Sequence, residues 1–180
     1  MYFPISNGLF NGVIQYIRDN RLQSIMNATS SGCFYLNRTA SVLLHEYGFY
    51  TEPNDSFGQW ILFEFKKNSF DFEGYSLYSD IYHEMPSSWD IEVSPDNVYW
   101  ALASSKTGEN TYTPGQSYST PLFKGVRYIK LTQTGRGGNE TRNTNYMLIN
   151  RIDFFGRLHR APALCTQAKT CRRSKPLSLL

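Results

Sequence analysis

Three things are scarce in this chain of 180 residues: cysteine, charge and long apolar runs. The three cysteines, Cys33, Cys165 and Cys171, are an odd number without a disulfide pattern, which is typical of a reducing compartment. No run reaches about 18 apolar residues and no basic segment with a following apolar stretch opens the chain, so we expect neither a membrane span nor a secretory signal. These absences predict a cytoplasmic protein, or a fragment of a longer one.

Four Asn-x-Ser/Thr sequences favour the opposite compartment, because they would accept glycans in a secreted protein. They begin at Asn27, Asn37, Asn54 and Asn139. Such matches arise by chance in a sequence rich in Ser, Thr and Asn, so we expect them to be unused, and the secreted alternative stays open.

Low charge and abundant aromatic residues indicate the fold class. Charged residues make up 18% of the chain, hydrophobic residues 41% and aromatic residues 16%. This composition excludes an intrinsically disordered chain and a helical bundle rich in Ala, Glu, Lys and Leu. Because aromatic residues are enriched in strands, we expect an all-β protein, and the length suits one domain.

The net charge of +3 is unevenly distributed. Residues 157–180 hold six Lys and Arg and no acid, which leaves 12 basic against 15 acidic residues in the rest of the chain. An acidic body is not typical of a nucleic-acid-binding fold, so we expect no nucleic-acid partner. We divide the chain into a domain over residues 1–157 and a basic, disordered tail over 158–180 that is dispensable for folding. As a hypothesis, the tail adds weak, salt-sensitive attraction to an anionic partner or membrane surface.

Apolar spacing predicts one short N-terminal helix. Four residues recur at the spacing of one helical face: Phe10, Val13, Ile14 and Ile17. The stripe ends near residues 18–20. Residues 25–58 are rich in Ser, Thr, Asn and Gly, which predicts long loops around a weak strand at 41–44. Loops of this length often carry function.

Alternation with a period of two predicts a series of strands, over residues 59–66, 74–79, 88–94, 98–102, 127–132 and 147–155. The turn at residues 94–97 joins two of them into a hairpin. We predict a core that includes Ile61, Phe63, Phe65, Trp89, Ile91, Val93, Trp100, Ile129, Leu131, Ile152 and Phe154, and we assign Trp60 to it as well. Short strands about ten residues apart indicate an antiparallel sandwich or jelly roll.

Four segments stand in an order and spacing that resemble a known family. They are residues 59–65 (QWILFEF), 88–100 (SWDIEVSPDNVYW), 127–131 (RYIKL) and 152–156 (IDFFG). Over about residues 10–157 the chain resembles a discoidin domain, the C-type domain of coagulation factors five and eight. The resemblance implies an eight-stranded, galactose-binding-like jelly roll that binds a ligand through loops at one end.

The opening FNGVI at residues 10–14 is similar to intracellular members of that family, which often accompany BTB or other interaction domains. Two departures from the family pattern are visible. The cysteine pair that ties the chain ends of secreted members together is missing. The family's strand aspartate is replaced by Glu64, and its aspartate-glycine turn by Asp96 and Asn97, both conservative changes.

No residue pattern indicates an enzyme, a metal site or a cofactor. His45, His83 and His159 lie far apart, and the tail cysteines lack the spacing of metal ligands. There is no GxSxG motif, and the Gly-rich residues 135–138 lack the helix that a phosphate loop needs. Asp80 and Glu84 are interpreted as solvated loop charges.

The resemblance directs attention to four loop stretches, residues 28–33, 48–58, 80–87 and 134–145. The candidate ligand-binding residues in them are Tyr50, Asn54, Phe57, Tyr82, His83, Arg136, Asn139, Arg142 and Asn145. Apolar contacts beside hydrogen-bonding groups suit a sugar or a peptide segment. We expect a non-catalytic module that binds a protein partner through these loops; the alternative is a lectin-like, carbohydrate-binding domain.

Overall fold

The computed structural model describes residues 1–6, 10–32, 43–44, 49–50, 58–79, 86–109, 116–135 and 147–160. The helical elements are α1 (Val13–Asp19) and the 3-10 turn η1 (Gln23–Ile25). The strands are β1 (Tyr2–Phe3), β2 (Met26–Ser30), β3 (Phe49–Tyr50), β4 (Trp60–Phe65), β5 (Ser69–Tyr78), β6 (Trp89–Ser94), β7 (Ala101–Lys106), β8 (Ser117–Val126), β9 (Tyr128–Gln133), β10 (Leu148–Ile149) and β11 (Arg151–His159).

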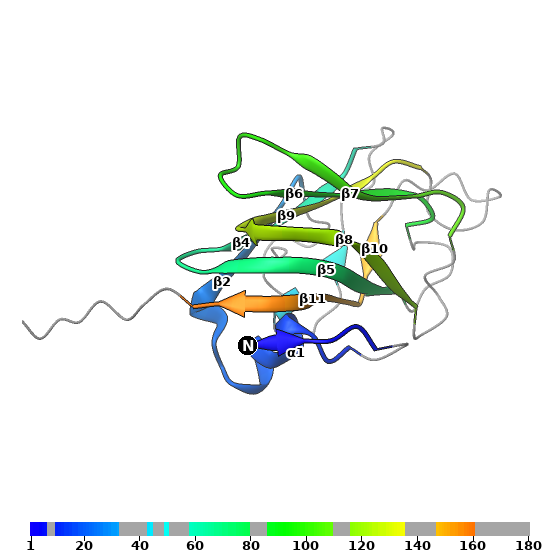
Figure 1. Cartoon of the computed structure of the whole chain (residues 1–180). Coiled ribbons are helices and arrows are strands. Elements are labelled where there is room, and N and C mark those ends of the chain that lie inside the picture. Colours follow the sequence, from blue (N-terminus) through cyan, green and yellow to red (C-terminus); the bar gives the residue numbers. More distant parts are fainter. Residues whose placement is uncertain are drawn as a thin grey trace, which may run out of the picture.

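The strands form an antiparallel β-sandwich with one short α-helix, which confirms the predicted fold class (Figure 1). One sheet has the order β1-β11-β5-β8 and the other β2-β4-β9-β6-β7, while β3 and β10 pair separately. The described residues form eleven strands instead of the eight we expected, because three of them, β1, β3 and β10, are two-residue strands.

The core lies between the two sheets. Phe63 of β4 meets Phe154 of β11 edge to face, with ring centroids 5.0 Å apart. Trp89 of β6 donates its indole N–H to the Tyr75 hydroxyl of β5 over 2.8 Å, so even the polar edge of this fully buried ring has a partner. All the predicted core residues are buried except Trp60 and Trp100.

The assignment of Trp60 and Trp100 to the core was wrong, since both are only half-buried. Trp60 alternates with the buried Ile61 and therefore lies on the outer face of its sheet. Trp100 precedes β7 because the hairpin turn is longer than predicted. The Asp96 carboxylate accepts the backbone N–H groups of Val98 and Tyr99, each over 2.9 Å, which holds both residues in the turn.

Four strands were not predicted: the two-residue strands β1 and β3 and the longer strands β2 and β8. β2 lies within the segment that we interpreted as loops, so residues 28–30 are strand and not loop. β8 forms one edge of its sheet and contains Pro121 and Gly125, with register shifts against β5. An edge strand tolerates proline and needs no clean alternation, which is why β8 carries no period-two signal.

The last strand does not stop at Gly156 as we expected. A bulge there, with Gly156 at φ 138°, carries β11 on to His159. Leu158 is 2% exposed, and its backbone N–H and C=O pair with Met1, over 2.7 and 2.8 Å. Leu158 and His159, which we assigned to the tail, are therefore part of the sandwich.

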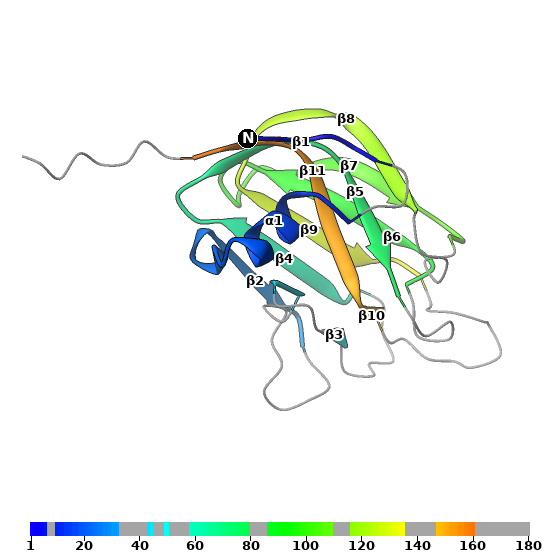
Figure 2. The ribbon, with the colours of Figure 1, turned by 90° about the horizontal axis from the view of Figure 1, so that it is seen from below.

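Helix α1 packs against β11 and contributes Val13, Ile14 and Ile17 to the core, as the stripe predicted (Figure 2). The fourth residue of the stripe, Phe10, precedes the helix and is half-buried. The helix has no N-cap side chain of its own. Asp153 of β11, 1% exposed, accepts the N–H groups of Gly12 and Ile14, each over 2.7 Å. A strand residue thus supplies the cap that the helix sequence lacks.

Candidate functional site

The two ends of the sandwich differ in chemistry. At one end, which we call the loop end, β2 and β9 finish and β4 and β6 begin. Backbone hydrogen bonds join the neighbouring strand ends there, from Gly58 to Gln133 and from Thr134 to Ser88, both over 3.0 Å. The candidate loops between β2 and β4, between β5 and β6 and between β9 and β10 connect to strands at this end.

Small polar side chains rim the loop end. The Ser31 hydroxyl donates to Gln59 Oε1 over 2.9 Å and accepts the Trp60 N–H over 3.0 Å. The Ser88 hydroxyl accepts the Gly108 N–H over 3.3 Å. Gln59 and Ser88 are both buried. The rim is therefore a hydrogen-bonded frame that holds the strand ends in fixed positions.

Gly135 closes this frame, because its backbone lies directly against Ser88. A Cβ at position 135 would meet the Ser88 Cβ and Oγ at 2.8 Å, closer than side-chain atoms approach one another. The Gly-rich stretch that begins here thus has a packing reason for its first glycine.

The structure places only one of the sequence-predicted site residues, and that one by its backbone. Tyr50 lies in β3 opposite Leu148 of β10. The other eight lie outside the described residues: Asn54, Phe57, Tyr82, His83, Arg136, Asn139, Arg142 and Asn145. The site at the loop end therefore stays a prediction, with its supporting frame now defined.

A row of outward-facing side chains next to the loop end was missed by the sequence analysis. Trp60, Thr132, Asp90 and Ser105 are successive cross-strand partners on β4, β9, β6 and β7. Directly opposite residues point to the same face of a sheet, so a half-exposed indole shares this face with carboxylate and hydroxyl groups. The alternation of residues 59–65 already indicated that the side chains of Trp60 and Ile61 point to different faces of the sheet. That signal was a better guide to the position of Trp60 than the size of its apolar ring.

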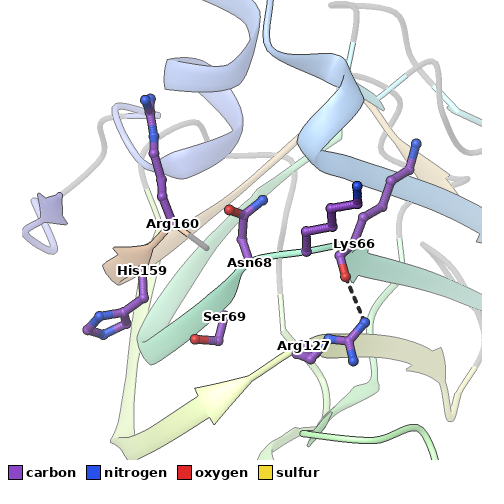
Figure 3. A pocket seen from close by; sticks show the side chains of 7 residues that line it. Lys66, Asn68, Ser69, Arg127, His159 and Arg160 are labelled. Carbon is purple, nitrogen blue, oxygen red and sulfur yellow. Dashed lines mark hydrogen bonds between the residues drawn. The ribbon is translucent and has the colours of Figure 1, made fainter. Parts of the chain in front are cut away.

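The opposite end, which we call the turn end, holds a basic pocket of about 390 Å³. Its lining comes from the β4–β5 turn, from the β8–β9 junction and from the end of β11 (Figure 3). The lining residues are Lys66, Lys67, Asn68, Ser69, Arg127, His159 and Arg160. The pocket joins residues from distant parts of the chain, which is why no sequence motif marked it.

One acidic side chain lies beside this pocket and is already engaged. The carboxylate of Asp71 contacts the His159 ring nitrogen at 2.8 Å and accepts the Gly125 N–H at 3.1 Å. Partial burial raises the pKa of Asp71, but the hydrogen bonds from His159 and Gly125 outweigh it and hold that pKa below its usual range.

Two further properties bear on function. Within the described ranges, no group of three or more His, Cys, Asp or Glu side chains is arranged to hold a metal ion. No helix in the described part of the chain is long and apolar enough to cross a membrane.

Comparison with known proteins gives the fold but no close relative. No protein-family model matches the chain, and no curated protein matches it. A family 32 carbohydrate-binding module of NanJ from Clostridium perfringens, solved in complex with galactose, is similar with a TM-score of 0.58 at 15% identity, over 74% of this chain and 95% of the module.

Two further structures are similar to the same degree. The Clostridium perfringens module CBM32-5, in complex with GalNAc-β-1,3-galactose, has a TM-score of 0.58 at 14% identity, over 74% of this chain and 97% of that one. The F5/8 type C domain of a Bacteroides fragilis protein has a TM-score of 0.58 at 11% identity, over 75% and 93%. The chain therefore has the galactose-binding-like sandwich of discoidin domains, as its sequence motifs indicated.

Proposed function

We propose that this protein is a non-catalytic carbohydrate-binding module that holds a sugar at the loop end of the sandwich. The observation that carries the proposal is the likeness of its fold, over about three quarters of the chain, to modules solved with galactose and with GalNAc-β-1,3-galactose. Because fold alone does not define a ligand, the proposal also needs a suitable site.

The loop end offers what a sugar site requires. A rigid frame of buried polar side chains, including Gln59 and Ser88, anchors the strands from which the candidate loops extend. Those loops carry aromatic rings, which stack on the apolar face of a sugar, and amide and guanidinium groups, which donate to its hydroxyls. We assign the stacking role to Tyr50, Phe57 and Tyr82.

The hydrogen-bonding role in the proposal belongs to six polar residues: Asn54, His83, Arg136, Asn139, Arg142 and Asn145. This reading replaces the one we put first from the sequence, in which the same loops contact a protein partner. Two of the similar structures described above were solved with a sugar.

A glycan array followed by titration calorimetry tests the proposal. The full chain should bind galactose-containing glycans saturably, and Arg136→Ala and Asn145→Ala should each weaken binding by about tenfold or more, as expected for loss of a hydrogen bond to a sugar. Matched controls are Arg157→Ala and Asn20→Ala, which remove the same side chains from exposed positions away from the loop end. The controls should leave the affinity within about twofold.

Two results would contradict the proposal. One is an array without saturable binding to any glycan, while the protein is folded by circular dichroism. The other is sugar binding that survives both loop variants and is lost in the controls.

A further inference from the structure

The basic pocket at the turn end is a second candidate site, separate from the proposed sugar site. We propose that it binds an oxyanion carried on a small polar molecule, a sulfate or phosphate monoester. The inference goes beyond the proposed function, because it concerns the opposite end of the sandwich and different residues.

The first argument is charge. Lys66, Lys67, Arg127 and Arg160 line the pocket, and none of the described lining residues is acidic. Lys66 and Lys67 are exposed, and neither forms an ion pair with any residue in the described ranges. Like charges repel one another, so gathering four of them costs stability unless an anion offsets the repulsion.

The second argument is that both guanidinium groups are oriented before any ligand arrives. Arg127 donates to the Lys66 backbone carbonyl over 2.7 Å and lies over the Tyr128 ring, 5.5 Å from its centroid. Arg160 donates to the Tyr16 hydroxyl and lies 5.9 Å from the centroid of that ring. A side chain that is already ordered loses less entropy on binding, and a planar guanidinium offers several N–H groups to one oxyanion.

The third argument is the framework between these two arginines. Asn68, 8% exposed, ends the tight turn from β4 to β5, and Ser69 is the first residue of β5. Figure 3 shows Asn68 between Arg160 and Arg127. The Asn68 N–H bonds to the Phe65 carbonyl over 3.3 Å, and the Arg127 N–H bonds to Ser94 over 2.9 Å. These bonds fix the backbone from which Asn68 and Arg127 extend into the pocket lining.

The size of the pocket indicates the class of ligand. A volume of about 390 Å³ falls within the range of small-molecule sites and exceeds the space that a bare ion fills. The carboxylate of Asp71, which contacts the lining residue His159, is already engaged with His159 and Gly125. The small molecule that carries the ester can therefore occupy the pocket while its sulfate or phosphate group contacts the cations.

Nuclear magnetic resonance titration of the full chain tests the inference, with sodium sulfate, sodium phosphate, galactose 6-sulfate and galactose as separate probes. Sulfate, phosphate and the sulfated sugar should shift the Asn68 and Ser69 amides and the Arg127 Nε–H saturably. Unmodified galactose should not shift them. Comparison of the inorganic ions with the ester shows whether the attached group adds affinity.

Paired variants separate a site from diffuse charge. Lys66→Ala with Lys67→Ala should weaken binding of galactose 6-sulfate at the turn end by about tenfold or more, since charge-assisted hydrogen bonds are lost. Lys106→Ala with Lys124→Ala removes the same two charges outside the pocket lining and should change the affinity by less than about twofold. Arg160→Ala, at an exposed position, gives a second test if the lysine pair folds poorly.

Three results would overturn the inference. They are the absence of saturable shifts at the turn end, equal losses in the two lysine pairs, and equal turn-end shifts with unmodified galactose. Galactose binding at the loop end should be unchanged in the lysine pair of the pocket, so failure here is distinguishable from failure of the proposed function.

Discussion

Gly12 and Asp153 lie so close together that position 12 has no room for a Cβ atom. The Gly12 N–H donates to the Asp153 carboxylate over 2.7 Å, and a Cβ on residue 12 would meet the other carboxylate oxygen at 2.5 Å. The same carboxylate accepts from Ile14, Gln15 and Phe154. Through this contact the start of α1 is fixed to β11, 141 residues further along the chain.

Replacement of Asp153 by asparagine should destabilise the fold. The amide keeps one acceptor oxygen and places an N–H₂ group against backbone N–H donors, leaving buried donors unpaired. We expect a loss of about 2 to 4 kcal/mol in the free energy of unfolding, measured by urea titration. Asp19→Asn on the exposed end of α1 is the matched control, with an expected change below about 0.5 kcal/mol. Equal stability of D153N and the wild type would contradict the capping role.

Stability should also depend on pH through Asp153. Burial raises the pKa of this carboxyl to about 6 from its ordinary 3.8, although the N–H groups of Ile14, Gly12, Phe154 and Gln15 act to lower it. The folded state then binds the proton more tightly than the unfolded state. The free energy of unfolding should therefore fall as the pH rises from about 4 to about 6, by on the order of 3 kcal/mol.

The measurement is the difference in unfolding free energy between the wild type and D153N from pH 4 to pH 7. Subtraction removes the other titrating groups, which the two proteins share. A difference that declines up to about pH 6 and is then constant supports the raised pKa. A difference in unfolding free energy that increases with pH would show that the four hydrogen bonds lower the pKa of Asp153 more than burial raises it.

The sequence predicted those strands in which burial of one face gives a clear alternation of apolar and polar residues. In β4, β6 and β9 every second residue is buried, and their inward residues were identified correctly. Edge strands such as β8 are under no such constraint, so they gave no signal. The contact of Gly12 with Asp153 was not predictable, because it depends on where a distant strand passes the helix.

The two candidate sites also differ in how far the sequence alone predicts them. The loop-end site was inferred from a family resemblance, and its polar frame depends on pairings between strands that only the structure gives. The basic pocket combines Lys66, Arg127 and Arg160, which are separated by tens of residues and follow no motif. Trp60 was misassigned because we weighed its apolar ring above the alternation of its strand.

Truncation distinguishes the strand end from the tail. Removal of everything after Arg157 deletes the buried Leu158 and its pairing with Met1, and should lower the melting temperature by more than about 5 °C. Truncation after Arg160 keeps these contacts and should lower it by less than about 2 °C. Similar melting temperatures for the two truncated proteins would place the C-terminal boundary of the folded domain at residue 157.

The most direct test of the central claim is a titration of the isotope-labelled full chain with a galactose-containing disaccharide, followed by amide resonances. The account predicts saturable shifts at the loop end, at Ser31, Gln59, Ser88 and Thr134, with the turn-end amides of Asn68 and Ser69 unchanged. Shifts confined to the turn end, or no saturable shift with any sugar that the array identifies, would contradict carbohydrate binding at the loop end.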